Sequence, residues 1–142
     1  MLEQPRVRDL PLLDVVVSLE TTTLADVCAA FGETDCRWVL VLDVEGAARG
    51  VVARAVVERH VARLSDLRVG MLPLQGVVEV SAAATVREAV LAIAAPGVEV
   101  LVCRHPGPTD PQLVSRDAVM GQPEWAPHDV PGLREALEPP AR

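Results

Sequence analysis

The chain has 142 residues, of which half are hydrophobic, with one Phe, two Trp, no Tyr and a formal net charge of −7. This length fits one domain or two small halves that share a core. The acidic balance, with no basic stripe and few aromatic residues, excludes nucleic-acid binding and disfavours an anionic membrane surface.

Targeting and metal-binding signals are also missing from the sequence. No apolar run reaches the roughly 20 residues that span a bilayer. The first five residues lack the charged start and apolar stretch of a signal peptide, so we expect a cytoplasmic protein. Cys28, Cys36 and Cys103 are odd in number and scattered, which disfavours a disulfide framework. The cysteines and histidines form no paired ligand spacing, so we expect no metal and no cofactor.

The first half of the chain predicts a strand, a capped helix, two strands and a second helix. A short strand at Val15–Val17 precedes Thr23, which with Asp26 forms a capping box. Apolar residues then recur with helical spacing, at Leu24, Val27, Cys28 and Phe31. A buried strand at Trp38–Leu42, a turn at Glu45-Gly46, a strand at Gly50–Ala53 and a helix with Val57, Val61 and Leu64 on one face follow.

The second half repeats this order about 62 residues later. Thr85 and Glu88 repeat the capping box, after a strand at Val77–Val80. A buried strand at Val98–Cys103 follows, and the proline-rich stretch 105–111 is expected to be an open loop. The last predicted elements are a strand at Gln112–Ser115, one turn of helix ended by Gly121, and a proline-rich tail with a short helix at Leu133–Leu137.

The duplication resembles a pair of CBS domains, the unit called a Bateman module, over about residues 6–120. The resemblance is carried by the Thr85-Val86-x-Glu88-Ala89 cap, by Val78-x-Val80, and by the strand runs that start at Val39 and Gly50. It implies an α/β (α+β) fold of two β-α-β-β-α repeats, at 6–66 and 67–120, packed by pseudo-twofold symmetry and followed by the tail 121–142. It also implies adenine nucleotides or adenosyl ligands in clefts between the repeats, and a homodimer.

The ligand motif of this family is a Gly, two hydrophobic residues, a Thr or Ser, two further residues and an Asp. In the first half Ala53 stands where the hydroxyl belongs and Val56 where the Asp belongs. In the second half Ser115 and Asp117 keep both groups, but the spacing is one residue shorter, which turns the carboxylate about 100° around a helix axis. The resemblance therefore favours the second-half cleft over the first.

The candidate ligand-binding residues are Ser115, Arg116, Asp117, Arg54 and Val78. Asp117 either contacts a ribose or caps the last helix. Arg54 and Arg116 hold equivalent places after the third strand of each repeat, where they either bind a phosphate or are ordinary surface arginines.

The two tryptophans have different expected roles. Trp38 is expected to pack under the repeat interface, and Trp125 to be an intermolecular anchor.

No convergent acid, base and nucleophile set is present, so we expect no enzyme activity. His60 is interpreted as a satisfied helix histidine. Two functions remain open. The first is a regulatory protein that binds an adenosyl-type small molecule and signals through dimer or partner contacts. The second is a ligand-free scaffold for dimerisation or protein–protein interaction.

Overall fold

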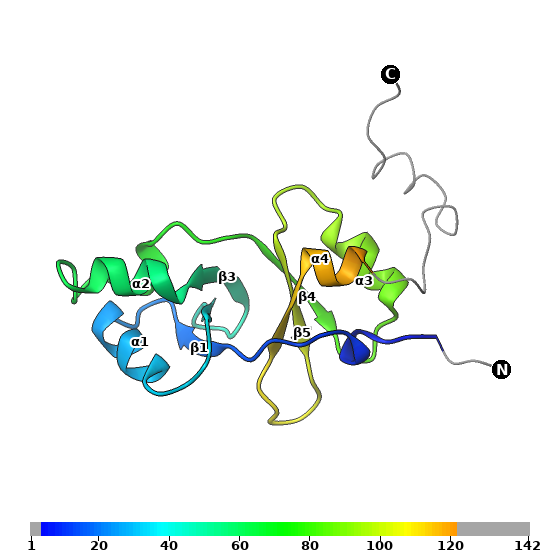
Figure 1. Cartoon of the computed structure of the whole chain (residues 1–142), viewed down its shortest axis with the longest axis horizontal. Coiled ribbons are helices and arrows are strands. Elements are labelled where there is room, and N and C mark those ends of the chain that lie inside the picture. The colour runs from blue at the N-terminus through cyan, green and yellow to red at the C-terminus, as the bar shows by residue number, and fades with distance from the viewer. Residues whose placement is uncertain (1–3, 122–142) are drawn as a thin grey trace, which may run out of the picture.

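The computed structural model describes residues 4–121, which form two similar halves (Figure 1). The tail with Trp125 and the stretch Leu133–Leu137 lie outside the described residues. The first half contains η1 (Val7–Asp9), β1 (Val16–Leu19), α1 (Leu24–Phe31), β2 (Trp38–Leu42), β3 (Ala48–Ala53) and α2 (Arg54–Val61). The second contains η2 (Val69–Met71), β4 (Val77–Ser81), α3 (Val86–Ile93), β5 (Val100–Arg104), β6 (Gln112–Ser115) and α4 (Arg116–Met120).

Each half has one three-stranded sheet, and the two sheets have the same topology. In the first sheet β1 pairs in parallel with β2, and β2 pairs antiparallel with β3. In the second sheet β4, β5 and β6 repeat that pattern. The predicted pair of β-α-β-β-α repeats is therefore confirmed, including the open loop between β5 and β6.

Both helices that follow the first strand of a repeat begin at the predicted threonine. The Thr23 hydroxyl accepts a hydrogen bond from the Asp26 N–H at 3.2 Å, and the Thr85 hydroxyl accepts one from the Glu88 N–H at 3.1 Å. The predicted apolar face of α2 is only partly correct. Val57 is buried, but α2 ends at Val61, and Leu64 lies beyond it with 46% of its surface exposed.

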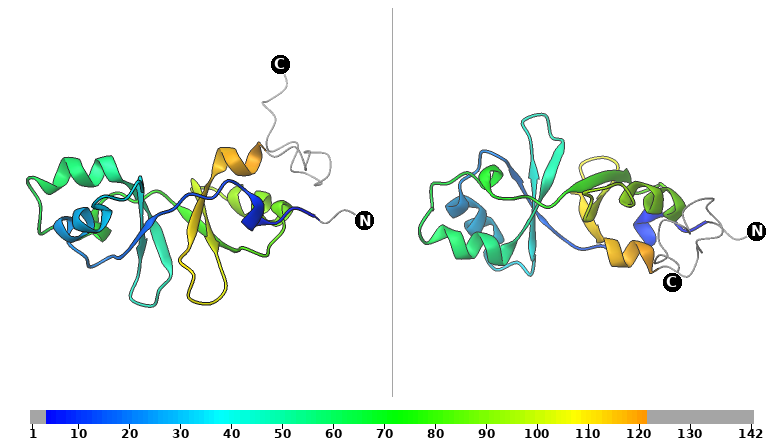
Figure 2. Two further views of the ribbon diagram at one scale, coloured as in Figure 1. Left: turned by 60° about the horizontal axis from the view of Figure 1, so that its bottom comes forward. Right: turned by 90° about the horizontal axis from the view of Figure 1, so that it is seen from above.

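The two sheets pack against each other, and the helices cover their outer faces (Figure 2). Because side chains alternate along a strand, the middle strands are buried on both faces. In β2, Val39 and Val41 pack toward the helices of the first half, whereas Leu40 packs toward the other sheet. The cluster between the sheets, called the inter-sheet core from here on, comprises Leu40, Val51, Val100, Val102 and Leu113. This double burial explains the unbroken hydrophobic runs in the sequence.

Two short segments cross from one half to the other. The η1 turn packs on the second half, where the Val7 N–H donates to the Ala84 carbonyl at 2.8 Å. The η2 turn packs on the first half, where the Val69 N–H donates to the Thr22 carbonyl at 2.8 Å. Each half therefore completes its core with a valine from outside its own βαββα unit. The predicted division at residues 66 and 67 stays a prediction.

No helix within residues 4–121 is long and apolar enough to cross a bilayer.

Because the inter-sheet core contains residues of both halves, we expect the two halves to unfold together. Leu40→Ala removes a fully buried side chain from it, and we expect a loss of about 2–5 kcal/mol in the free energy of unfolding with a single transition. Urea denaturation followed by circular dichroism measures this loss. Val17→Ala, on a side chain with 36% exposure, is the control and should cost about 0.5 kcal/mol or less. Equal losses in both variants would contradict the assignment of this core.

Candidate functional site

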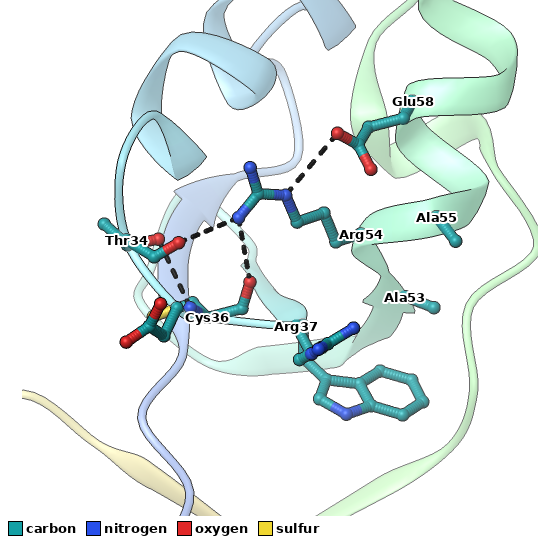
Figure 3. A pocket seen from close by; sticks show the side chains of 9 residues that line it. Thr34, Cys36, Arg37, Ala53, Arg54, Ala55 and Glu58 are labelled. Carbon is teal, nitrogen blue, oxygen red and sulfur yellow. Dashed lines mark hydrogen bonds and ion pairs between the residues drawn. The ribbon is translucent and has the colours of Figure 1, made fainter.

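A cavity of about 850 Å³ lies in the first half, between the loop from α1 to β2 and the junction of β3 with α2 (Figure 3). A second cavity of about 530 Å³ shares residues 34–38 and reaches the segment before β1. We call the two together the first-half cleft. It is lined by Leu12, Leu13, Asp14, Thr34, Asp35, Cys36, Arg37, Trp38, Ala53, Arg54, Ala55 and Glu58.

One wall of the first-half cleft is attached to the second half of the chain. The backbones of Leu13 and Leu113 exchange two hydrogen bonds, of 2.8 and 2.9 Å. The Gln112 side-chain amide also donates to the Asp14 carboxylate at 2.8 Å, and its carbonyl oxygen lies 2.8 Å from His105 Nε2. The facing wall, residues 34–38, belongs to the first half. All the lining residues therefore belong to the first half, and the wall formed by residues 12–14 is hydrogen-bonded to the second half.

Arg54 holds the facing wall in place. Its guanidinium donates to the carbonyls of Gly32 at 3.2 Å and Thr34 at 2.9 Å, with a longer bond to Cys36 at 3.4 Å. The same group lies 3.6 Å from Glu58 and 5.1 Å from the centre of the Phe31 ring. In Figure 3 the Arg54 side chain reaches toward the loop that carries Thr34 and Cys36. Most of its donors are used within the chain, so a phosphate would have to displace these contacts.

Arg116 makes the equivalent contacts in the second half. It follows β6 as Arg54 follows β3, and its guanidinium donates to the carbonyls of Ile93 at 2.7 Å and Val98 at 3.3 Å. Both arginines thus bind the carbonyls that the end of a helix and the next loop leave without helical partners. Neither is an ordinary surface arginine, because each fastens a loop.

The other predicted site residues lie around the start of α4 and on β4. The Ser115 hydroxyl accepts from the Ala118 N–H at 3.1 Å, so Ser115 caps α4 and the predicted cap at Asp117 is wrong. Asp117 lies exposed in the first turn of α4. Val78 is half-buried and packs against the core of the second half. Ser115, Arg116 and Asp117 are therefore together, whereas Arg54 lies at the first-half cleft.

In the second half, the place equivalent to the smaller cavity of the first-half cleft is closed. Gly76 stands 62 residues after Asp14, and its carbonyl accepts hydrogen bonds from the N–H groups of Glu99 at 2.8 Å and Val100 at 3.3 Å. A Cβ at Gly76 would lie 1.9 Å from the Gly97 carbonyl oxygen. The segment before β4 thus touches the loop before β5, whereas residues 12–14 and 34–38 border an open space.

Sequence reasoning missed Arg37 and most of the other residues that line the open cleft. Trp38 was predicted to pack under the repeat interface, and it does pack, half-buried, against the inter-sheet core while it lines the cleft. A signal for Arg37 was present in the repeat itself, because Arg37 precedes β2 at the place where Glu99 precedes β5. His60 is satisfied as predicted, with Nδ1 2.8 Å from the Val56 carbonyl.

Several solved structures with the same fold are described as containing CBS domains. One is the CBS domain of a membrane protein from Sphaerobacter thermophilus, at 17% identity, 83% and 87% coverage of the two chains, and a TM-score of 0.57. Another is that of a putative transporter from Clostridium difficile 630, at 12% identity, 83% and 92% coverage, and 0.58. A hemolysin-like protein of Oenococcus oeni matches at 12%, 83% and 84%, and 0.54.

This chain has the fold of a CBS-domain pair. The predicted resemblance is therefore confirmed at the level of the fold. No protein-family model matches the sequence, and no curated protein does.

The thiols of the chain differ in their surroundings. Burial raises the pKa of the Cys103 thiol above its ordinary value. Burial also raises the pKa of Cys28, helped by the Glu58 carboxylate and opposed by Arg54. Cys36 lines the first-half cleft and is half-buried. Within residues 4–121 no group of three or more His, Cys, Asp or Glu side chains has an arrangement that holds a metal.

Because Arg54 and Arg116 make equivalent contacts, we expect their substitution to cause similar losses of stability. Arg54→Gln and Arg116→Gln each leave helix-end carbonyls without a charged donor, and we expect each to cost about 1–2 kcal/mol of unfolding free energy, since both side chains are partly exposed. Urea denaturation of both variants measures this. Stability unchanged in both would mean that the arginines are ordinary surface residues.

We expect the three cysteine thiols to react with iodoacetamide at different rates. At pH 8 the buried Cys103 should react least in the folded protein, because a raised pKa leaves less thiolate below pH 9. Peptide mass mapping after timed alkylation gives each rate. Modification of Cys103 as fast as Cys36 would show that the second-half core opens readily.

Proposed function

We propose that this CBS-domain pair is a regulatory module, not an enzyme, that binds an adenine nucleotide or another adenosyl ligand between its repeats. The observation that carries the proposal is the first-half cleft, one wall of which, residues 12–14, is hydrogen-bonded to the second half. Its larger cavity of about 850 Å³ lies within the size range of small-molecule sites. A ligand that touched both walls would favour one arrangement of the repeats over another.

The cleft supplies the groups that such a ligand needs. The Trp38 indole offers a flat apolar surface for a purine, and the Asp35 and Glu58 carboxylates accept hydrogen bonds from ribose hydroxyls or an exocyclic amine. Arg37 offers a cation for a phosphate. These groups would take the place of the hydroxyl and the carboxylate of the family motif, which this chain replaces by Ala53 and Val56.

Signalling through a homodimer or a protein partner, in the cytoplasm, is part of the same proposal. A ligand that shifts the pairing of the halves changes any surface that the halves form together. Size-exclusion chromatography with light scattering, with and without ligand, tests this part separately from binding.

The second candidate function is a ligand-free scaffold for dimerisation or protein binding. It is favoured by the engagement of the predicted ligand residues within the chain. Arg54 and Arg116 bind backbone carbonyls, and the Ser115 hydroxyl caps α4.

A thermal-shift screen separates the two functions. The purified chain is heated with AMP, ADP, ATP, S-adenosylmethionine or NAD, each at about 1 mM. A ligand with a dissociation constant of about 10 μM adds about 2.7 kcal/mol of stability, which raises the Tm by several degrees. A shift with at least one compound supports the ligand-binding module. An unchanged Tm with all of them contradicts it and favours the scaffold.

Protection of Cys36 locates the ligand. A compound in the first-half cleft should slow alkylation of Cys36, which lines both of its cavities, and leave Cys28 unaffected. The readout is again the rate of iodoacetamide modification by mass mapping. A stabilising ligand that does not protect Cys36 binds elsewhere.

A further inference from the structure

The two halves have diverged at the residue that precedes the middle strand. Arg37 stands directly before β2 and Glu99 directly before β5, 62 residues later. The next residues differ as well, because Trp38 is half-buried and lines a cavity, whereas Val100 is 8% exposed within the inter-sheet core. The open place therefore carries a cation and an indole, and the closed place carries a carboxylate and a valine.

Arg37 is available to a ligand. Its side chain is exposed, and no hydrogen bond or ion pair joins its guanidinium to another residue of the described chain. The other arginine of the cleft, Arg54, is bound to loop carbonyls and to Glu58. An anionic group that enters the first-half cleft thus meets one guanidinium whose donors are not used by any residue of 4–121.

The carboxylates around Arg37 limit how much negative charge the cleft accepts. Asp35 and Glu58 line the larger cavity, and Asp14 lines the smaller one. A ligand with one anionic group can place it at Arg37, whereas further phosphates would approach these carboxylates and be repelled.

We infer that the ligand binds in the first-half cleft and not at the equivalent place in the second half, and that Arg37 binds the single anionic group of that ligand. The inference rests on the proposed function and deepens it. It names the ligand class as an adenosyl compound with one anionic group, held from the loop before β2. In the second half the contact of Gly76 with Gly97–Val100 closes the part that corresponds to the smaller cavity, and Glu99 beside it would repel an anion.

Isothermal titration calorimetry with AMP, ATP and adenosine tests the inference on three forms of the chain. The forms are the wild type, Arg37→Gln and the matched control Glu99→Gln, which makes a similar change at the equivalent place. We expect one AMP per chain, and weaker binding of ATP than of AMP. Arg37→Gln should weaken AMP about tenfold or more, because it removes a charge-assisted hydrogen bond, and leave adenosine affinity unchanged. Glu99→Gln should match the wild type.

Several results would overturn the inference while leaving the proposed function intact. These are binding of AMP with unchanged affinity in Arg37→Gln, two AMP per chain, tighter binding of ATP than of AMP, or an equal loss in Glu99→Gln. If none of the three compounds binds the wild type, the inference fails, and the thermal-shift screen shows whether the proposed function fails with it. Circular dichroism of Arg37→Gln confirms that this exposed substitution leaves the fold in place.

Discussion

The packing of one sheet against the other is the constraint on which the rest of the structure depends. A three-stranded sheet covered by two short helices leaves its second face apolar, and in each half that face carries fully buried residues such as Leu40 and Val102. Burial of one such side chain contributes about 1.5–3 kcal/mol, so neither half is expected to be stable with this face in water. The exchanged turns around Val7 and Val69 add to the same dependence, because each completes the core of the other half.

The site is a consequence of that arrangement. Where segments of the two halves meet beside the inter-sheet core, the chain either closes the gap or leaves a cleft. At Gly76 the missing side chain allows the backbone to reach the loop before β5, and hydrogen bonds from Glu99 and Val100 seal the contact. In the first half, Asp14 occupies the equivalent place and its carboxylate binds Gln112 instead. A duplicated unit thereby has unlike surfaces at two equivalent places.

Most of the fold could be predicted from local features of the sequence. The threonine caps, the hydrophobic period of α1 and α3, and the unbroken strand runs each reflect a local rule, and they led to the correct repeat. The η1 and η2 turns were missed because three residues leave no periodic signal and their role depends on a distant core. The candidate site was harder to predict, because it also depends on contacts between residues that are distant in the sequence. The motif comparison pointed to Ser115 and Asp117, whereas the open cleft is set by long-range contacts at Leu13, Asp14 and Gly76. The contacts of Arg54 with loop carbonyls likewise depend on folding of the loop.

The central claim is that the open first-half cleft receives the ligand and that the equivalent place in the second half, closed at Gly76, does not. A titration of ¹⁵N-labelled protein with AMP, followed by amide chemical shifts, tests it most directly. The largest shifts should lie in residues 12–14, 34–38 and 53–58. Shifts centred instead on residues 96–100 and 115–118 would contradict it, because they would place the ligand in the half that the structure shows closed at Gly76.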